Sequence, residues 1–124
     1  VHVGQSDMPC DITRRLIGED KILGVSAATV EEAKKAENDS ADYIGTGAIF
    51  PTATKDDAES VTKKDLSNIV NSINIPVVAI GGITIDNADE LKDTGIAGLS
   101  VVSAIMGADD PKKASKKLLN IFNS

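Results

Sequence analysis

Short runs of aliphatic and β-branched residues return along the chain at regular distances, and longer polar segments separate them. Each run is too short for a helix and rich in Val and Ile, which is typical of a buried strand. The spacing between successive runs is about 20 residues, except for one interval that is longer by about 13. We therefore predict five strands, at residues 1–3, 22–25, 43–44, 77–80 and 99–102.

The polar segments between these runs carry helix start signals. Thr29 is followed three residues later by Glu32, and Thr62 by Asp65, which is the spacing of a capping box. Asp110-Pro111 places an N-cap residue and an N1 proline before the last apolar stripe. We predict helices that begin at Pro9, after Thr29, after Thr62, at Asp86 and at Pro111, with Gly18 and Gly95 ending the first and the fourth.

Strands that alternate with single helices form parallel, right-handed crossovers, and parallel strands need cover on both faces. The predicted fold class is therefore α/β, with a parallel (β/α) repeat. Tyr43, Phe50 and Phe122 are the only aromatic residues, so the core is aliphatic, as in the interior of a TIM barrel. Such a barrel needs eight βα units and about 250 residues to close. Five units form either an open sheet or a partial TIM barrel.

Composition and charge narrow the class of partner. The chain has 124 residues, which is one domain at most, and 13 Lys and Arg against 19 Asp and Glu give a net charge of -6. We expect neither a nucleic acid nor a membrane as a partner, because a chain with this net negative charge has no excess of positive charge to attract an anionic surface. Cys10 has no partner cysteine for a disulfide, which favours a cytoplasmic location. We expect no signal peptide before Val1 and a chain that begins within a longer protein.

The site of a parallel βα protein lies at the carboxyl ends of its strands. The residues that come directly after each predicted strand are therefore the candidates for binding and catalysis. The longest of these segments, residues 45–61, contains Pro51-Thr52-Ala53-Thr54-Lys55. One interpretation is that the two hydroxyls and the ammonium group, which lie within four residues, bind an anion. The other is that the segment is a solvated turn with a capping threonine, which explains these residues equally well. Ser26 follows the second strand. Arg14 and Arg15 lie on the first helix, so Lys55 is the candidate cation of the site.

Other strand-end residues allow two interpretations each. Asp7 could ligate a hard cation such as Mg²⁺, or it could be a turn residue ahead of Pro9. Gly82 could bring its backbone close to a ligand or form a tight turn, and Ser103 could hold phosphate or cap a helix. His2 lies within a strand, so we expect a buried, hydrogen-bonded core residue. Cys10 lies near a helix start that would lower its thiol pKa, yet no second Cys or His supports a nucleophilic site.

Taken together, these segments resemble thiamine phosphate synthases over essentially the whole chain. The Pro-Thr-x-Thr-Lys loop is the specific part of the resemblance, because many phosphate-binding barrels have the two glycines. The resemblance rests on residues 1–8 and on Gly24-Val25-Ser26 for the family's fourth and fifth strands, on residues 47–55 for its signature loop, and on residues 79–83 and 101–105 for its seventh and eighth strands.

The resemblance implies that residues 1–124 are the C-terminal part of a single TIM-barrel domain. The complete enzyme joins an aminopyrimidine diphosphate to a thiazole phosphate, with Mg²⁺ as cofactor, and releases pyrophosphate. It implies catalytic roles for Ser26 and Lys55. By the same resemblance Asp7 is the metal ligand, Ser26 and Lys55 bind the pyrimidine diphosphate, and Thr52, Ala53, Thr54, Gly82, Val102 and Ser103 bind the thiazole phosphate.

The chain departs from the family by omission, because a Gln-x-Arg-x-Lys segment and an Asn-Asp pair have no counterpart in it. We therefore expect little or no synthase activity from the chain alone. One alternative is a thiazole tautomerase-like barrel, but Ala28 occupies the region of that enzyme's histidine. Another is a non-catalytic barrel fragment. Such a fragment would pair its open sheet edge with another chain. That chain would be either a second copy, in a homo-oligomer, or a separate N-terminal piece of the barrel.

Overall fold

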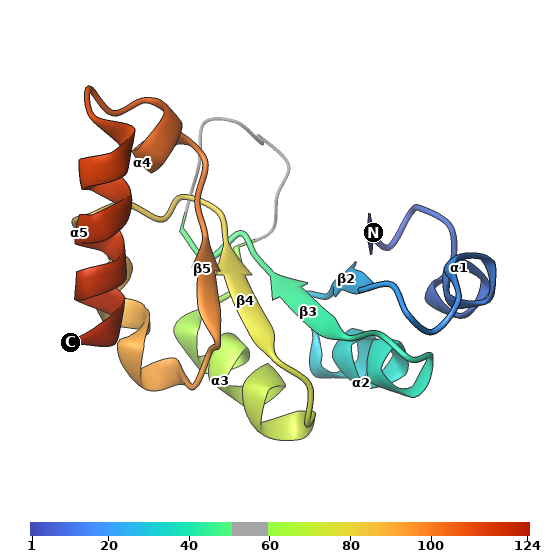
Figure 1. Cartoon of the computed structure of the whole chain (residues 1–124). Helices are drawn as coiled ribbons and strands as arrows, with labels where there is room; N and C mark the ends of the chain where they lie inside the picture. Colours follow the sequence, from blue (N-terminus) through green and yellow to red (C-terminus); the bar gives the residue numbers. More distant parts are fainter. Residues whose placement is uncertain (51–59) are drawn as a thin grey trace.

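A computed structural model describes residues 1–50 and 60–124 of the chain. Five parallel strands form one sheet in the order β1-β2-β3-β4-β5, and a helix follows each strand (Figure 1). The fold is therefore the predicted α/β repeat. The strands are β1 (His2–Val3), β2 (Gly24–Ser26), β3 (Tyr43–Thr46), β4 (Val77–Ile80) and β5 (Gly98–Ser100), and the helices are α1 (Cys10–Ile17), α2 (Val30–Asn38), α3 (Lys63–Ser72), the 3-10 helix η1 (Ala88–Thr94), α4 (Ser103–Met106) and α5 (Pro111–Asn123).

Several element boundaries differ from the sequence prediction. β1 begins at His2, β3 extends to Thr46, β5 begins at Gly98 and α1 begins at Cys10. β2 begins at Gly24 rather than Ile22, and the Ile22 carbonyl instead accepts a hydrogen bond from the amino group of Val1 at 2.8 Å. β5 ends at Ser100, because the chain turns there into α4. The segment predicted as a helix from Asp86 is a 3-10 helix that begins at Ala88. No helix in residues 1–50 and 60–124 is long and apolar enough to cross a membrane.

The caps that the sequence predicts are present. The Thr62 hydroxyl accepts a hydrogen bond from the Asp65 N–H at 3.1 Å, and the Asp65 carboxylate accepts one from the Thr62 N–H at 3.3 Å. The Thr29 hydroxyl accepts a hydrogen bond from the N–H of Glu32 at 3.1 Å, but the Glu32 carboxylate accepts from the Ala28 N–H instead of the Thr29 N–H, so only half of this capping box forms. These caps fix where α2 and α3 start, and so they fix the length of the strand-to-helix connections on which the candidate site lies.

The two faces of the sheet have different surroundings. Ile44 and Thr46 of β3 are fully buried, as is Ala79 of β4, while Tyr43 is half-buried and Ile80 is exposed. Because side chains alternate between the faces of a strand, the helices cover one face and leave the other open. Figure 1 shows the helical layer on one side of the twisted sheet, with α1 near one edge and α5 near the other. Parallel sheets are normally covered on both faces, so this open face lacks its cover among residues 1–50 and 60–124.

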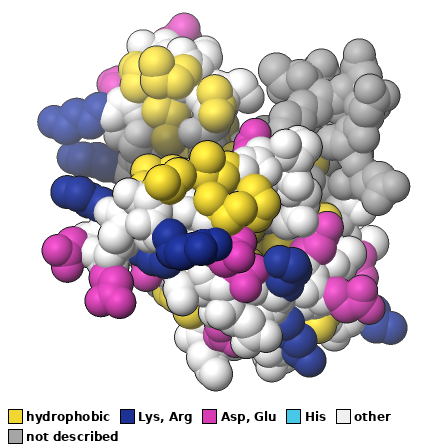
Figure 2. All heavy atoms as spheres, turned by 90° about the vertical axis from the view of Figure 1, so that its right-hand side faces the viewer, with side chains coloured by type: hydrophobic (Ala, Val, Ile, Leu, Met, Phe, Trp, Pro, Cys, Tyr) yellow, Lys and Arg dark blue, Asp and Glu magenta, His cyan; other side chains and the backbone are white. Residues whose placement is uncertain are grey.

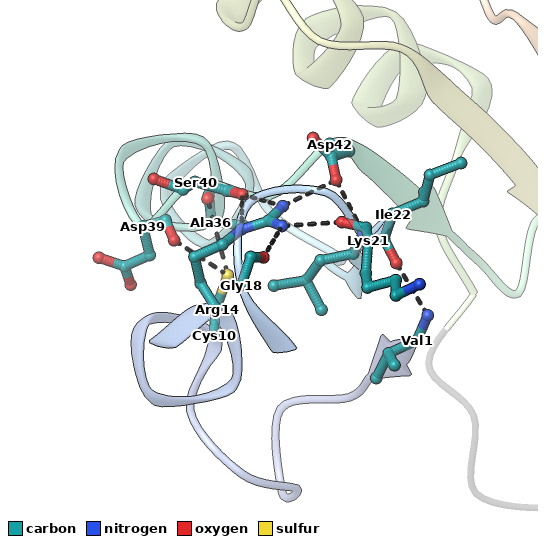
Figure 3. Close-up of polar contacts among 11 residues, drawn as sticks. Val1, Cys10, Arg14, Gly18, Lys21, Ile22, Ala36, Asp39, Ser40 and Asp42 are labelled. Atoms are coloured by element: carbon teal, nitrogen blue, oxygen red, sulfur yellow. Dashed lines mark hydrogen bonds and ion pairs between the residues drawn. The ribbon is translucent and has the colours of Figure 1, made fainter. Parts of the chain in front are cut away.

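Arg14 ties together the loops at the amino ends of the strands (Figure 3). Its side chain is 13% exposed, and its guanidinium lies 2.7 Å from the Asp42 carboxylate. The same Asp42 oxygen accepts a hydrogen bond from the Leu23 N–H at 2.8 Å, which fixes the approach to β2. This network belongs to the end of the sheet that supports stability rather than chemistry in βα folds. The guanidinium also donates to the carbonyl oxygens of Gly18, Lys21 and Ser40.

The Asp42 interaction predicts a pH-dependent stability difference. The hydrogen bond from Arg14, followed by that from the Leu23 N–H, holds the pKa of Asp42 below its usual value of 3.8. A depressed pKa stabilises the fold above the unfolded value, and that stability is lost as pH falls through the folded value. Asp42→Asn is therefore expected to lower the unfolding free energy by about 1 kcal/mol at neutral pH, and the difference should vanish in strong acid.

Urea unfolding of both proteins across the acid range measures this difference. Asp11→Asn is the matched control, because the Asp11 carboxylate lies 4.0 Å from Arg15 with both side chains exposed. It should change the unfolding free energy by less than about 0.5 kcal/mol. An Asp42→Asn deficit that stays equal at neutral and strongly acidic pH would contradict the prediction.

Candidate functional site

The loops at the carboxyl ends of the strands enclose a pocket of about 560 Å³. Its lining is mainly apolar, with a few polar groups, which is the usual character of a small-molecule site. Glu32 is the only charged side chain among the described residues that line it. Its lining consists of Gln5, Ser26, Ala27, Ala28, Glu32, Gly45, Gly47, Ala48, Ile80, Gly81, Gly82, Ile83, Ser100, Val101, Val102 and Ser103.

Four of the predicted site residues, which come from three different strand ends, line this pocket together. They are Ser26 at the end of β2, Gly82 after β4, and Val102 and Ser103 after β5. Up to 77 residues of sequence separate them, and the parallel topology alone brings them to one end of the sheet. The structure therefore brings these four residues together, while their roles toward a substrate stay predictions.

Gly81 and Gly82 allow the loop after β3 to pack against the loop after β4. Both have left-handed backbones, with φ of +100° and +68°. A Cβ atom at Gly81 would lie 2.7 Å from the Ala48 Cα, and one at Gly82 would lie 2.6 Å from the Phe50 carbonyl oxygen. The Phe50 N–H donates to the Gly81 carbonyl at 3.1 Å, which joins the two loops. The glycines thus form the predicted turn and also leave bare backbone facing the pocket.

Ser26 ends β2 and is held by neighbours from other strands. The His2 Nε2 lies 2.8 Å from the Ser26 hydroxyl, and the Tyr43 hydroxyl lies 2.9 Å from the His2 Nδ1. The Gln5 amide donates to the Ser26 carbonyl at 2.7 Å. The expectation of a buried core position for His2 is wrong, because His2 lies exposed on the open face of the sheet. The sequence could not show this, since a two-residue strand does not reveal which of its faces the helices cover.

Glu32 is a pocket residue that the sequence interpretation assigned to capping alone. Its carboxylate accepts a hydrogen bond from the Ala28 N–H at 2.8 Å and lines the pocket at the same time. Its position in the first turn of α2, the helix that follows β2, is the signal that could have identified it. A carboxylate held by a backbone donor here gives the pocket one negative group.

Ser103 is the first residue of α4 and not its cap. The N-cap position is Val102, which makes no capping hydrogen bond, and the Ser103 side chain is exposed. The alternative that Ser103 caps the helix is therefore wrong. The first N–H groups of a helix have no partner within it, so the backbone around Val102 and Ser103 offers donors to the pocket.

Asp7 lies in the turn after β1, two residues after the pocket residue Gln5, but it does not line the pocket itself. Its carboxylate accepts a hydrogen bond from the Gly4 N–H at 2.7 Å, so it is a turn residue as one interpretation predicts. It is also exposed, and Mg²⁺ is often held by one or two carboxylates together with substrate phosphates. Asp7 fits one ligand position of such a site. Within residues 1–50 and 60–124, no three His, Cys, Asp or Glu side chains gather as a metal site.

The remaining predicted residues fall into two sets. Thr52, Ala53, Thr54 and Lys55 lie outside the described residues. Cys10 is buried, with its sulfur 3.5 Å from the Asp39 carbonyl oxygen, and burial raises the pKa of its thiol. The expected lowering of that pKa by the helix start is therefore wrong, and Cys10 packs as a small core residue.

Comparisons with known proteins agree on one family. A sequence model described as thiamine monophosphate synthase matches residues 1–105. The thiamine-phosphate synthase of Methanobrevibacter smithii is 68% identical over 124 residues, which are 100% of this chain and 59% of that protein. The thiamine-phosphate synthase of Clostridium tetani is 55% identical over 123 residues, which are 99% of this chain and 59% of that protein.

A solved structure gives the same result. The thiamine phosphate pyrophosphorylase of Pyrococcus furiosus superimposes with a TM-score of 0.89 at 44% identity, over 98% of this chain and 58% of that one. The chain therefore spans about three fifths of the length of the relatives that it matches. The fold corresponds to part of a TIM-barrel thiamine phosphate synthase, and the chain belongs to the thiamine monophosphate synthase family.

Proposed function

We propose that the chain is the C-terminal five βα units of a thiamine phosphate synthase. The complete barrel would couple 4-amino-2-methyl-5-hydroxymethylpyrimidine diphosphate with a thiazole phosphate to give thiamine phosphate and pyrophosphate. The observation that carries this proposal is the pocket at the carboxyl ends of the strands. Ser26, Gly82, Val102 and Ser103 line it together, and these are the positions for which the resemblance implies substrate contacts.

Exposed apolar side chains at both edges of the sheet support the assignment as a barrel fragment. At the β1 edge, Ile12 and Leu16 of α1 are 39% and 69% exposed, and Figure 2 shows hydrophobic side chains gathered on the face turned toward this side. At the β5 edge, Met106 and Leu119 are 75% and 58% exposed. Three further βα units would complete the eight of a barrel and cover both edges at once. A second copy of the chain is the alternative partner for the same edges.

The proposed reaction begins with departure of the pyrophosphate leaving group. Negative charge builds on the diphosphate, and a pyrimidine-methyl cation forms that the thiazole nitrogen captures. The site must therefore stabilise charge on the leaving group rather than supply a strong base. Lys55 is the cation that this chain would contribute to the diphosphate, with Ser26 toward the pyrimidine. Thr52, Ala53, Thr54, Gly82, Val102 and Ser103 would bind the thiazole phosphate through hydroxyl and backbone groups.

A magnesium ion would be held by Asp7 and by a second carboxylate outside this chain. When bound, the ion would supply a positive charge to the diphosphate oxygens. The Gly4 N–H fixes one oxygen of the Asp7 carboxylate at 2.7 Å, so the carboxylate is oriented before any ligand binds. The site would thus accept phosphorylated small molecules with their metal.

The tautomerase alternative receives no support from the pocket. Ala28 lines it at the place where that activity would require a histidine, and a methyl group transfers no proton. His2 is the one histidine of the sequence, and its ring nitrogens contact Ser26 and Tyr43. We therefore retain the synthase as the proposed activity.

A completed barrel tests the proposed function. The first three βα units of the Methanobrevibacter smithii relative, joined ahead of Val1, would supply the missing diphosphate-binding and metal-binding residues. This protein is expected to form thiamine phosphate and pyrophosphate from the two phosphorylated substrates and Mg²⁺. The chain alone should be slower by at least about 1000-fold, because loss of one charge-stabilising group already costs about 100-fold or more.

Chromatography of thiamine phosphate over time measures both rates. Lys55→Ala in the completed barrel is the control, because it removes a cation that residues 1–124 contribute. It shows whether the added units produce the activity by themselves. A folded completed barrel that forms no thiamine phosphate would contradict the proposal, as would equal rates for the chain alone and the completed barrel.

A further inference from the structure

Three polar side chains from neighbouring strands form a hydrogen-bonded line across the open face of the sheet. Tyr43 of β3 contacts His2 of β1 through its hydroxyl, at 2.9 Å from the Nδ1 atom. His2 contacts Ser26 of β2 through its Nε2 atom, at 2.8 Å from the hydroxyl oxygen. Ser26 is the member that lines the pocket. We call these three residues the Tyr43–His2–Ser26 line.

Glycines on the strands make room for this line. A Cβ atom at Gly24 would lie 2.0 Å from the Tyr43 Cζ, and one at Gly45 would lie 3.2 Å from the His2 Cε1. Glycine weakens a strand, and within strands it often marks a close approach. The two rings are 5.6 Å apart and tilted by 40°, so they support each other across β2. The placement of both rings therefore depends on the backbone of two strands and is not a chance surface contact.

The order of the three residues along the strands gives the line a direction. His2 pairs with Gly24 and Gly24 with Tyr43, so both rings lie at one level of the sheet. Ser26 lies two residues further toward the carboxyl end, at the pocket. Nothing in the proposed reaction uses His2 or Tyr43 directly. Their contact with the pocket passes through the Ser26 hydroxyl.

We infer that His2 and Tyr43 are positioning residues that fix the rotation of the Ser26 hydroxyl and direct its proton into the pocket. A phenol O–H is a strong donor and an imidazole nitrogen is a strong acceptor, so the Tyr43 hydroxyl donates to the His2 Nδ1. The Nε2–H then donates to the Ser26 oxygen. With that lone pair occupied, the Ser26 O–H turns toward an acceptor of the ligand, such as a ring nitrogen of the aminopyrimidine.

This inference rests on the proposed synthase function. It adds His2 and Tyr43 as a pair of residues that affect the use of the pyrimidine diphosphate only. Ser26 is expected to face the pyrimidine, while the thiazole phosphate lies nearer to Gly82 and Ser103. Loss of the Tyr43 hydroxyl should therefore weaken use of the pyrimidine diphosphate and spare the KM for the thiazole phosphate. If Tyr43→Phe instead loosened the sheet in general, the kinetic constants for both substrates would change.

A double-mutant cycle in the completed barrel tests the line. Tyr43→Phe keeps the ring over Gly24 and removes the hydroxyl, and it is expected to lower kcat/KM for the pyrimidine diphosphate about fivefold, the value of one hydrogen bond. In a Ser26→Ala background the same change should have no further effect, because its target is gone. Ser100→Ala is the matched control, since Ser100 also lines the pocket at the end of a strand but makes no hydrogen bond to His2 or Tyr43 among the described residues. In that background Tyr43→Phe should still cost about fivefold.

Nitrogen NMR of the His2 ring provides a readout that does not depend on activity. The unmodified protein should show a protonated Nε2 and an unprotonated Nδ1, and Tyr43→Phe should move the ring toward a mixture of tautomers. Equal losses from Tyr43→Phe with and without Ser26 would overturn the inference, as would an unchanged His2 tautomer. If the completed barrel has no synthase activity, the proposed function fails, while the NMR result still decides whether Tyr43 sets the state of His2.

Discussion

Gly82→Ala in the completed barrel is expected to lower kcat/KM for the thiazole phosphate by about 100-fold, because misplacement of a binding group by about 1 Å costs this much. The backbone of Gly82 is left-handed, with φ of +68°, and a Cβ there would lie 2.6 Å from the Phe50 carbonyl oxygen. That oxygen is backbone and cannot rotate away. The substitution must therefore separate the loops after β3 and β4, and both loops line the pocket.

Steady-state kinetics with each substrate varied in turn measures this effect. Gly18→Ala is the matched control, because Gly18 has a similar φ of +83° and no atom within 4 Å of its would-be Cβ. It lies after α1, away from the pocket, and shares the backbone strain without the collision. Gly18→Ala should reduce the thermal midpoint and leave kcat/KM nearly unchanged. Equal kinetic losses in both variants would show that backbone strain alone, and not the pocket, explains the Gly82 effect.

Asp7→Asn is expected to lower kcat by about 100-fold or more, the usual effect of removing one group that stabilises developing charge. The amide retains the size of the side chain, and its oxygen can still accept from the Gly4 N–H, which lies 2.7 Å from the carboxylate. The turn should therefore survive while the negative charge for a cation is lost. The concentration of Mg²⁺ needed for half-maximal rate should rise together with the loss in kcat.

Turnover of the completed barrel over a magnesium titration provides the measurement. Asp11→Asn serves as the control, since Asp11 is a similarly exposed carboxylate four residues further on, and its carboxylate lies 4.0 Å from Arg15. A magnesium dependence that is the same in Asp7→Asn and in the unmodified protein would contradict a role for Asp7 in metal binding.

The strands and helices could be predicted because their signals are local. The capping pairs at Thr62 and Asp65 and at Thr29 and Glu32 lie within one helical turn, so the sequence alone specifies them. The Val and Ile runs specify parallel strands once helices are seen between them. The convergence of Ser26 and Gly82 follows from the topology and needs no side-chain detail.

Contacts across strands could not be predicted in this way. His2 meets Tyr43 and Ser26 only because β1, β2 and β3 lie side by side in a particular register. The alternation of a strand two residues long does not tell which side chain faces the helices, so a single histidine in it suggested a core position. Burial of Cys10 likewise depends on how α1 packs against the end of α2, where the Asp39 carbonyl contacts its sulfur.

The proposed function requires that the strand ends form one site for phosphorylated ligands. Amide NMR of the labelled completed barrel, titrated with the thiazole phosphate, tests this directly. The signals of Gly82, Val102 and Ser103 should shift together and give one dissociation constant, while those around Arg14 and Asp42 at the opposite end should stay in place. Shifts confined to the Arg14 end, or separate dissociation constants for Gly82 and Ser103, would contradict a common site.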